Sequence, residues 1–169
     1  MSTLGSNHTA LNAALGRIAN LTVAIAGIAI VGMAAVEAWQ VFARYVMNDS
    51  PSWTEPVALL LMSTAMMFGA AAGVRANRHF GFFLLAERAA ASPRKVLQLI
   101  PQLIAVGIGL MFAVWGADMT IDAWGFPMAG APLPQGMVFL PMCAGGALIA
   151  LFALEQIVSP PPLPAPAGD

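Results

Sequence analysis

Charged residues are scarce in this sequence, whose 169 residues include 7 Lys and Arg, 8 Asp and Glu, and 2 His. Charged residues make up 9% of the chain, against about 25% in a typical soluble domain. Apolar residues make up 59%, so an ordinary soluble fold is excluded. The net charge of −1 gives no reason to expect a nucleic-acid partner.

The sequence is also poor in residues that carry chemistry. Its single cysteine, Cys143, excludes an intramolecular disulfide framework and leaves a Cys-based redox or metal site without ligands. Haem b would need paired histidines at membrane depth, but His8 precedes the first apolar segment. No nucleophile elbow, Walker loop, HExxH or CxxC motif is present. We therefore expect neither an enzyme nor a cofactor.

Four long apolar segments dominate the rest of the chain. The first contains an uncharged and mostly apolar run, Ile18 to Val36, which as a helix covers about 28 Å, roughly one hydrocarbon thickness. We predict an all-α integral membrane protein: a single four-helix membrane domain, residues 1–158, then a disordered Pro-rich tail, residues 159–169. The predicted spans cover about residues 17–44, 53–73, 93–122 and 137–158.

The connecting segments carry helix-start signals. Ser52 and Glu55 fit a capping box before the second span. Ser92 followed by Pro93 is typical of an N-cap at the start of the third span. Residues 79–91 are too short to cross a bilayer and too apolar for solvent, which predicts a short interfacial helix between the second and third spans.

Basic residues are concentrated on one side of the predicted membrane. The charged break from residue 75 to residue 95, which includes the start of the third span, holds five of the seven: Arg75, Arg78, Arg88, Arg94 and Lys95. The next connector has no base and is flanked by acids. The positive-inside rule therefore places the basic break, and with it both termini, in the cytoplasm.

Small residues spaced four apart predict where helices approach closely, because lipid gives no hydrophobic drive for helix association. Such positions occur in the second span, the third span and the fourth span; the candidates for helix packing are Gly69, Gly73, Gly109, Ala113 and Gly146.

Glu37 is the acid most nearly within a span. It could carry a proton or cation, as intramembrane carboxylates often do. Alternatively, it is an interfacial side chain paired with Gln40 or Arg44, which share its helix face. The second reading is favoured, because Glu37 follows a complete apolar run and so lies near the membrane surface.

Other polar residues have simple interpretations at helix ends. Trp53 suits an aromatic belt, and Glu55 suits a helix N-terminus. Asp118 and Asp122 are expected to be solvated, and His79 to meet lipid head groups or a partner.

The order of these features resembles a known family. The chain reads Arg44-Tyr45, Asn48 and then Ser50-Pro51-Ser52-Trp53-Thr54-Glu55 before the second span. Gly73-Val74-Arg75 and Arg78-His79 follow that span, and Ala131-Pro132-Leu133-Pro134 and Pro141 lead into the fourth. Over about residues 15–158 this is similar to the small membrane (Q) subunit, DctQ type, of TRAP transporters. Pro56 and Phe83 depart from the family pattern, and any role of the aspartate that often replaces Phe83 is not transferred.

The resemblance implies a multi-pass protein of the bacterial inner membrane. Such a subunit is a fixed scaffold for a large (M) subunit, which moves the substrate by an elevator-like mechanism coupled to sodium. A periplasmic substrate-binding protein delivers an organic acid. Trp53, Glu55, Asp118, Asp122 and residues 132–135 would face that protein. Arg75, Arg78 and His79 would anchor the cytoplasmic edge. Independently of the resemblance, Glu37 and Arg44 lie in the polar end of the first span and are expected at the interface.

Two other functions fit a small four-span chain. One is a self-contained proton-coupled exporter that uses Glu37 in a homodimer, which would need that carboxylate near mid-membrane. The other is a membrane anchor for an enzyme or assembly. A stable complex with a much larger membrane protein favours the transporter subunit, and transport by the chain alone favours the exporter.

Replacing Arg75 and Arg78 with Glu is expected to impair insertion or anchoring, because the positive-inside signal depends on this basic cluster. Labelling of introduced cysteines measures the topology, and co-purification measures the yield of the membrane partner. Unchanged labelling together with a normal partner yield would contradict the prediction.

Overall fold

The computed structural model describes residues 3–76 and 91–158 and is all-helical over these residues. Its four long helices are apolar enough to cross a membrane, as predicted. In chain order the elements are α1 (Thr3–Phe42), the π-helical η1 (Ala43–Met47), α2 (Thr54–Arg75), α4 (Ala91–Ala123), the 3₁₀-helical η2 (Gln135–Phe139) and α5 (Leu140–Val158).

The helix boundaries differ most from the predicted spans at the start of α1. This helix begins at Thr3, well before the predicted start at residue 17. Hydropathy marks the part of a helix that lies in lipid, whereas polar residues such as Asn12 and Arg17 can continue the helix outside it. The tail, 159–169, and all of the predicted interfacial segment except Ala91 lie outside the described residues. Arg78 and His79 also lie outside them.

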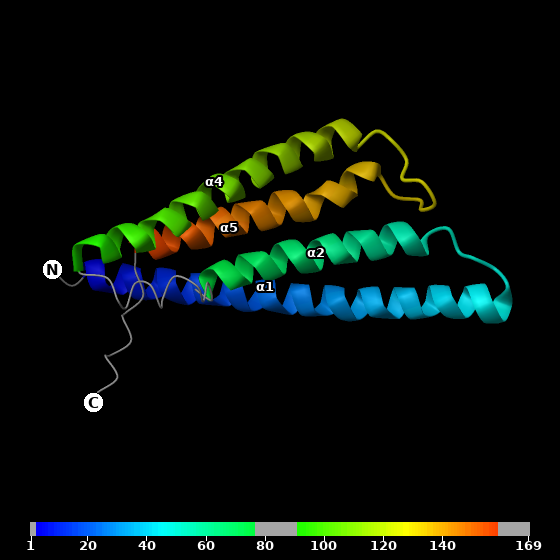
Figure 1. Ribbon diagram of the computed structural model, residues 1–169, viewed down its shortest axis with the longest axis horizontal. Helices are drawn as coiled ribbons and strands as arrows, with labels where there is room; N and C mark the ends of the chain where they lie inside the picture. The colour runs from blue at the N-terminus through cyan, green and yellow to red at the C-terminus, as the bar shows by residue number, and fades with distance from the viewer. Residues whose placement is uncertain (1–2, 77–90, 159–169) are drawn as a thin grey trace, which may run out of the picture.

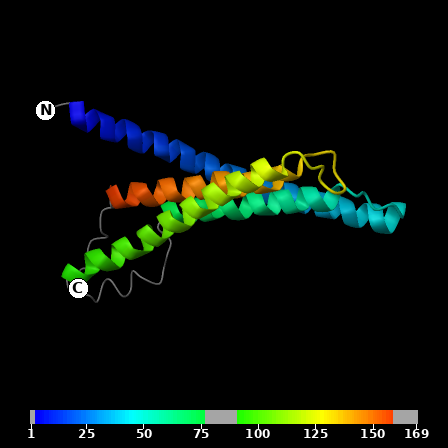
Figure 2. The ribbon, with the colours of Figure 1, turned by 90° about the horizontal axis from the view of Figure 1, so that it is seen from above.

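The four long helices lie side by side in the order α1, α2, α5, α4, with α2 and α5 in the centre (Figure 1). Neighbours α1 and α2 run antiparallel, as do α5 and α4, whereas α2 and α5 run in the same direction. From above, α1 and α4 spread apart toward the end at which α1 begins (Figure 2). This order leaves α1 and α4 with one helical neighbour each along most of their length.

The core lies where α1, α2 and α5 meet. Ala19, Ala71, Ile149 and Phe152 form one buried cluster, in which Ala71 and Phe152 have no exposed surface. Three of these positions carry small or branched side chains, so one large ring fills the space between the helices. Burying such a ring removes a large apolar area from contact with its surroundings.

Two adjacent glycines allow α5 to approach both of its neighbours. A Cβ at Gly145 would lie 2.6 Å from Cβ of Met67 on α2. A Cβ at Gly146 would lie 2.6 Å from the backbone nitrogen of Ala113 on α4. Because consecutive helical residues point in different directions, one glycine serves each neighbour. The central position of α5 therefore depends on this pair.

The α4 side of the same contact is also built from small residues. A Cβ at Gly109 would lie 2.6 Å from the backbone nitrogen of Ala150, and one at Gly116 would lie 2.6 Å from that of Cys143. Thus Gly109, Ala113 and Gly146 meet within this chain. By contrast, no atom of the neighbouring described residues lies within 4 Å of a Cβ at Gly69 or Gly73. Those two glycines of α2 open onto free surface in the described structure.

Two predicted helix starts are wrong. The Ser52 hydroxyl donates to the Gly130 carbonyl at 3.1 Å, so Ser52 does not form a capping box with Glu55. Trp53 is the N-cap residue of α2, and no side chain caps this end. In α4, helix begins at Ala91, so Ser92 lies inside the first turn rather than at the N-cap.

Replacing Gly109 with Val is expected to destabilise the isolated chain by about 1–3 kcal/mol, because the added side chain meets the α5 backbone. Gly107→Val is the matched control, since Gly107 lies in the same helix and the substitution changes helix propensity by the same amount. A Cβ at Gly107, however, has free space around it. Thermal unfolding in detergent compares the two variants. Equal melting temperatures for both would show that the α4–α5 contact does not require glycine.

Candidate functional site

A polar cluster joins three helices at the end where α2 and α5 finish. We call it the polar clamp: Arg75, Gln102, Glu155 and Gln156. Arg75 donates from Nε to Oε2 of Glu155 at 2.9 Å and from Nη2 to Oε1 at 3.0 Å. This two-pronged geometry matches the planar guanidinium to the carboxylate. The side chains are 26% and 14% exposed, so the pair is largely shielded.

The two glutamines extend the clamp to the backbone of α2 and to α4. Nε2 of Gln156 donates to the Val74 carbonyl in the last turn of α2. Oε1 of Gln156 accepts from Nε2 of Gln102 on α4 at 3.3 Å. Oε1 of Gln102 is buried without a hydrogen-bond partner among the described residues.

The polar clamp also contacts the buried core, through Arg75 and Phe152. The Arg75 guanidinium carbon lies 5.7 Å from the ring centroid of Phe152, within the range of a cation–π contact. The cation is thus stabilised by a carboxylate on one side and an aromatic ring on the other. The cluster can hold α2, α4 and α5 together at this end, and its charges cancel, so it has no free charge with which to bind an ion.

Sequence reasoning missed most of this cluster. It assigned Arg75 to anchoring at the membrane edge but did not select Glu155, Gln156 or Gln102. The sequence signal that could have identified the cluster is Glu155 followed by Gln156, near the end of the otherwise apolar fourth span. Because Arg75 also holds Glu155, reversing its charge affects folding as well as topology, and the two readouts must be measured separately.

The opposite end of the layer carries both described connectors, residues 48–53 and 124–134, and we call it the connector end (Figure 1). The longer connector folds back on itself: Met128 N–H donates to the Leu133 carbonyl at 2.8 Å, and Gln135 N–H to that of Phe126 at 2.9 Å. Gly130 has φ of +86°, and its carbonyl accepts from the Ser52 hydroxyl. The two connectors are therefore tied together.

Glycine is required at position 130 for two reasons. Its positive φ is disfavoured for other residues, and a Cβ there would collide with the carbonyl oxygen of Ser52. The close approach of the two connectors depends on this position.

The predicted polar residues of the connector end do not converge. Glu37, Arg44, Glu55, Asp118 and Asp122 are all exposed. Among the side chains that the structure describes, the one ion pair joins Arg75 to Glu155, so Glu37 is not paired with Arg44. Nor does it form a hydrogen bond with Gln40 there. The described residues also hold no group of three His, Cys, Asp or Glu side chains suited to a metal ion.

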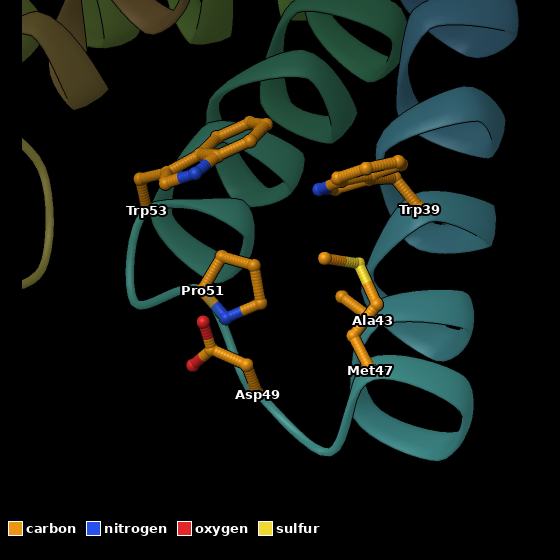
Figure 3. Close-up of a pocket in the computed structure, with 6 residues that line it drawn as sticks. All are labelled: Trp39, Ala43, Met47, Asp49, Pro51 and Trp53. Carbon is orange, nitrogen blue, oxygen red and sulfur yellow. The ribbon is translucent and has the colours of Figure 1, made fainter.

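A hollow of about 450 Å³ lies between the end of α1 and the start of α2 (Figure 3). The indoles of Trp39 on α1 and Trp53, the residue before α2, extend toward each other. The remaining lining comes from Ala43, Met47, Asp49 and Pro51. Sequence reasoning placed Trp53 at this interface but did not pair it with Trp39.

Comparison with known proteins gives one family. The family model described as tripartite ATP-independent periplasmic transporters, DctQ component, matches residues 33–160, about three quarters of the chain. The match includes the whole polar clamp and the whole hollow, and it confirms the resemblance found in the sequence. No curated protein matches the chain at a significant level.

Replacing Glu155 with Gln is expected to lower the stability of the chain by about 1–2 kcal/mol, because Arg75 loses its paired carboxylate in a shielded site. Glu55→Gln makes the same chemical change at an exposed position without an ion pair and should have little effect. Unfolding in detergent measures both. Stability losses of similar size in the two variants would rule out a stabilising role for the clamp.

Proposed function

Because the chain belongs to the DctQ family of tripartite ATP-independent periplasmic transporter components, we propose that it is the fixed scaffold of such a transporter. In this role it supports the large substrate-moving membrane subunit and helps to dock a periplasmic substrate-binding protein. The transported solute is an organic acid, and its uptake is coupled to sodium.

The observation that carries this proposal is the open helix layer. Both edge helices carry large apolar side chains that no other part of the described chain covers. Ile28 on α1 is 72% exposed, Val31 on α1 70% and Ile121 on α4 73%. Four helices in a row enclose little space, and the core is filled by Phe152 and its neighbours. Exposed apolar area of this extent is suited to lipid and to a larger membrane partner.

The polar clamp supports a fixed rather than a moving layer. It joins α2, α4 and α5 at one end, while Gly145 and Gly146 bring the same three helices close together in the middle. Sliding of one helix past another would break the ion pair and bring side chains into the glycine contacts. A rigid layer of this kind suits a subunit against which another subunit moves.

The proposed orientation puts the polar clamp at the cytoplasmic side of the bacterial inner membrane and the connector end in the periplasm. Its support is the distribution of basic residues: Arg75 at the clamp end is one of five between positions 75 and 95, and the connector end has only Arg44. Both termini are then cytoplasmic.

The proposed docking surface for the binding protein lies at the connector end. Glu55, Asp118 and Asp122 are exposed there, residues 132–134 belong to the folded longer connector, and Gln135 begins η2. Tying of the two connectors through Ser52 and Gly130 presents this surface in a defined shape. A preformed surface binds with less ordering cost than a flexible one.

The exporter alternative finds little support. Glu37 is exposed on an edge helix, beyond the apolar run that ends at Val36. The lining residues of the hollow at the connector end lie after the apolar run of α1 and before α2. The hollow therefore opens at the membrane surface rather than between helices at mid-depth. An exporter would need a polar path through the middle of the layer.

The proposal is tested by co-purification and reconstitution. The tagged chain should be recovered from native membranes in a stable complex with a much larger membrane protein. Proteoliposomes should take up an organic acid with sodium only when that protein and the periplasmic binding protein are both supplied. Transport by this chain alone would refute the scaffold role.

Glu37→Gln is expected to leave the sodium-to-substrate stoichiometry of the reconstituted complex unchanged, because Glu37 is exposed on the edge helix and joins no cluster of ion ligands in the described residues. Paired measurements of ²²Na⁺ and substrate flux give this ratio. A changed ratio would assign Glu37 to ion coupling after all.

A further inference from the structure

The hollow at the connector end is lined by aromatic, apolar and acidic side chains. Its two largest lining side chains are indoles, Trp39 from α1 and Trp53 from the residue before α2 (Figure 3). Asp49 adds a carboxylate, and no basic residue among those the structure describes lines the hollow. Negative ring faces and a carboxylate both favour a cation over an anion.

The backbone holds this hollow open. The last turn of α1 widens into the π-helix η1, and the chain then reverses at Asn48, which has φ of +52°. The Asp49 N–H donates to the Ala43 carbonyl at 3.1 Å and closes this turn. Asp49 is thereby fixed beside the helix end, while Pro51 restricts the chain that follows. Single π-helical turns are frequently found at functional sites.

The depth of the hollow matches lipid head groups. It begins three residues after Val36, the last residue of the apolar run of α1, and ends at Trp53, just before the second apolar helix. Tryptophans are enriched at this level because the indole has an apolar body and a polar N–H group. A ligand of the hollow is therefore a molecule that resides at the membrane surface.

We propose that this hollow binds the ammonium group of an aminophospholipid such as phosphatidylethanolamine. The ammonium lies against the indoles of Trp39 and Trp53 and pairs with the Asp49 carboxylate. Among the described side chains no cation already forms an ion pair with Asp49. The volume of about 450 Å³ falls within the range of about 300–1,000 Å³ that is typical of small-molecule sites.

The lipid site would have a structural consequence. Its lining residues come from α1 and from the connector into α2, so a bound head group bridges an edge helix to the centre of the layer. This inference needs only that the chain lies in a membrane. It does not depend on the proposed scaffold or docking roles, and its failure would leave them intact.

Native mass spectrometry tests the proposal on the full chain. The protein is released from nanodiscs that contain equal amounts of phosphatidylethanolamine and phosphatidylglycerol with the same acyl chains. These lipids share the phosphate and the chains and differ in the ammonium group. The wild-type chain is expected to retain phosphatidylethanolamine about five- to ten-fold more than phosphatidylglycerol, as one shielded ammonium contact would give. Equal retention of the two lipids would overturn the proposal.

Matched variants locate the site. Asp49→Asn and the double variant Trp39→Ala/Trp53→Ala are expected to abolish the preference. The controls are Asp122→Asn and Trp124→Ala, which alter an exposed acid and an exposed tryptophan elsewhere at the connector end and should retain the preference. Circular dichroism checks that each variant is helical. Trp39→Phe keeps an aromatic ring in the hollow and should retain part of the preference. A preference that survives in Asp49→Asn, or that is lost equally in the controls, would contradict the assigned site.

Discussion

The close approach of α5 to both of its neighbours is the contact on which the rest of the structure depends. Gly145 admits Met67 of α2, and Gly146 admits the backbone of α4 near Ala113. Lipid tails are as apolar as leucine, so in a membrane this close packing has to supply what hydrophobic burial supplies in water. With α5 fixed in the centre, the glutamate and glutamine near its end reach both α2 and α4. The polar clamp is thus a consequence of the glycine contact as well as a second support for it.

The layer divides its chemistry between its two ends. At one end a largely shielded ion pair and two glutamine side chains join α2, α4 and α5. Their polar groups are directed largely at one another. At the other, acids are exposed, two connectors are tied through Ser52 and Gly130, and indoles face a hollow. The middle of the layer is apolar, and its helices meet there through small residues. This division suits a membrane subunit that contacts other molecules at its surface and holds no solute within it.

Sequence reasoning predicted the four helices because the length of an apolar run is set by the bilayer, which is a constraint on local sequence alone. It could not decide which small residues pack. Gly69 and Gly109 both lie in ladders spaced by four, yet the first opens onto free surface and the second meets the α5 backbone. The difference depends on which neighbour lies alongside, and that is fixed by contacts distant in sequence. The Ser52 error has the same cause, since its acceptor at Gly130 is 78 residues away. Glu155 was missed because an acid near the end of a span reads as an interfacial charge until its partner is known.

A fixed layer is the central claim, and distances within the chain during transport test it most directly. Spin labels at exposed positions of the two edge helices, Ile28 on α1 and Ile108 on α4, with Cys143 replaced by Ala, allow pulsed electron paramagnetic resonance in the assembled transporter. The account predicts the same distance distribution in the empty state and in the state loaded with sodium and substrate. A distribution that shifts between the two states would show that this chain moves with the substrate-carrying subunit, and it would contradict the account.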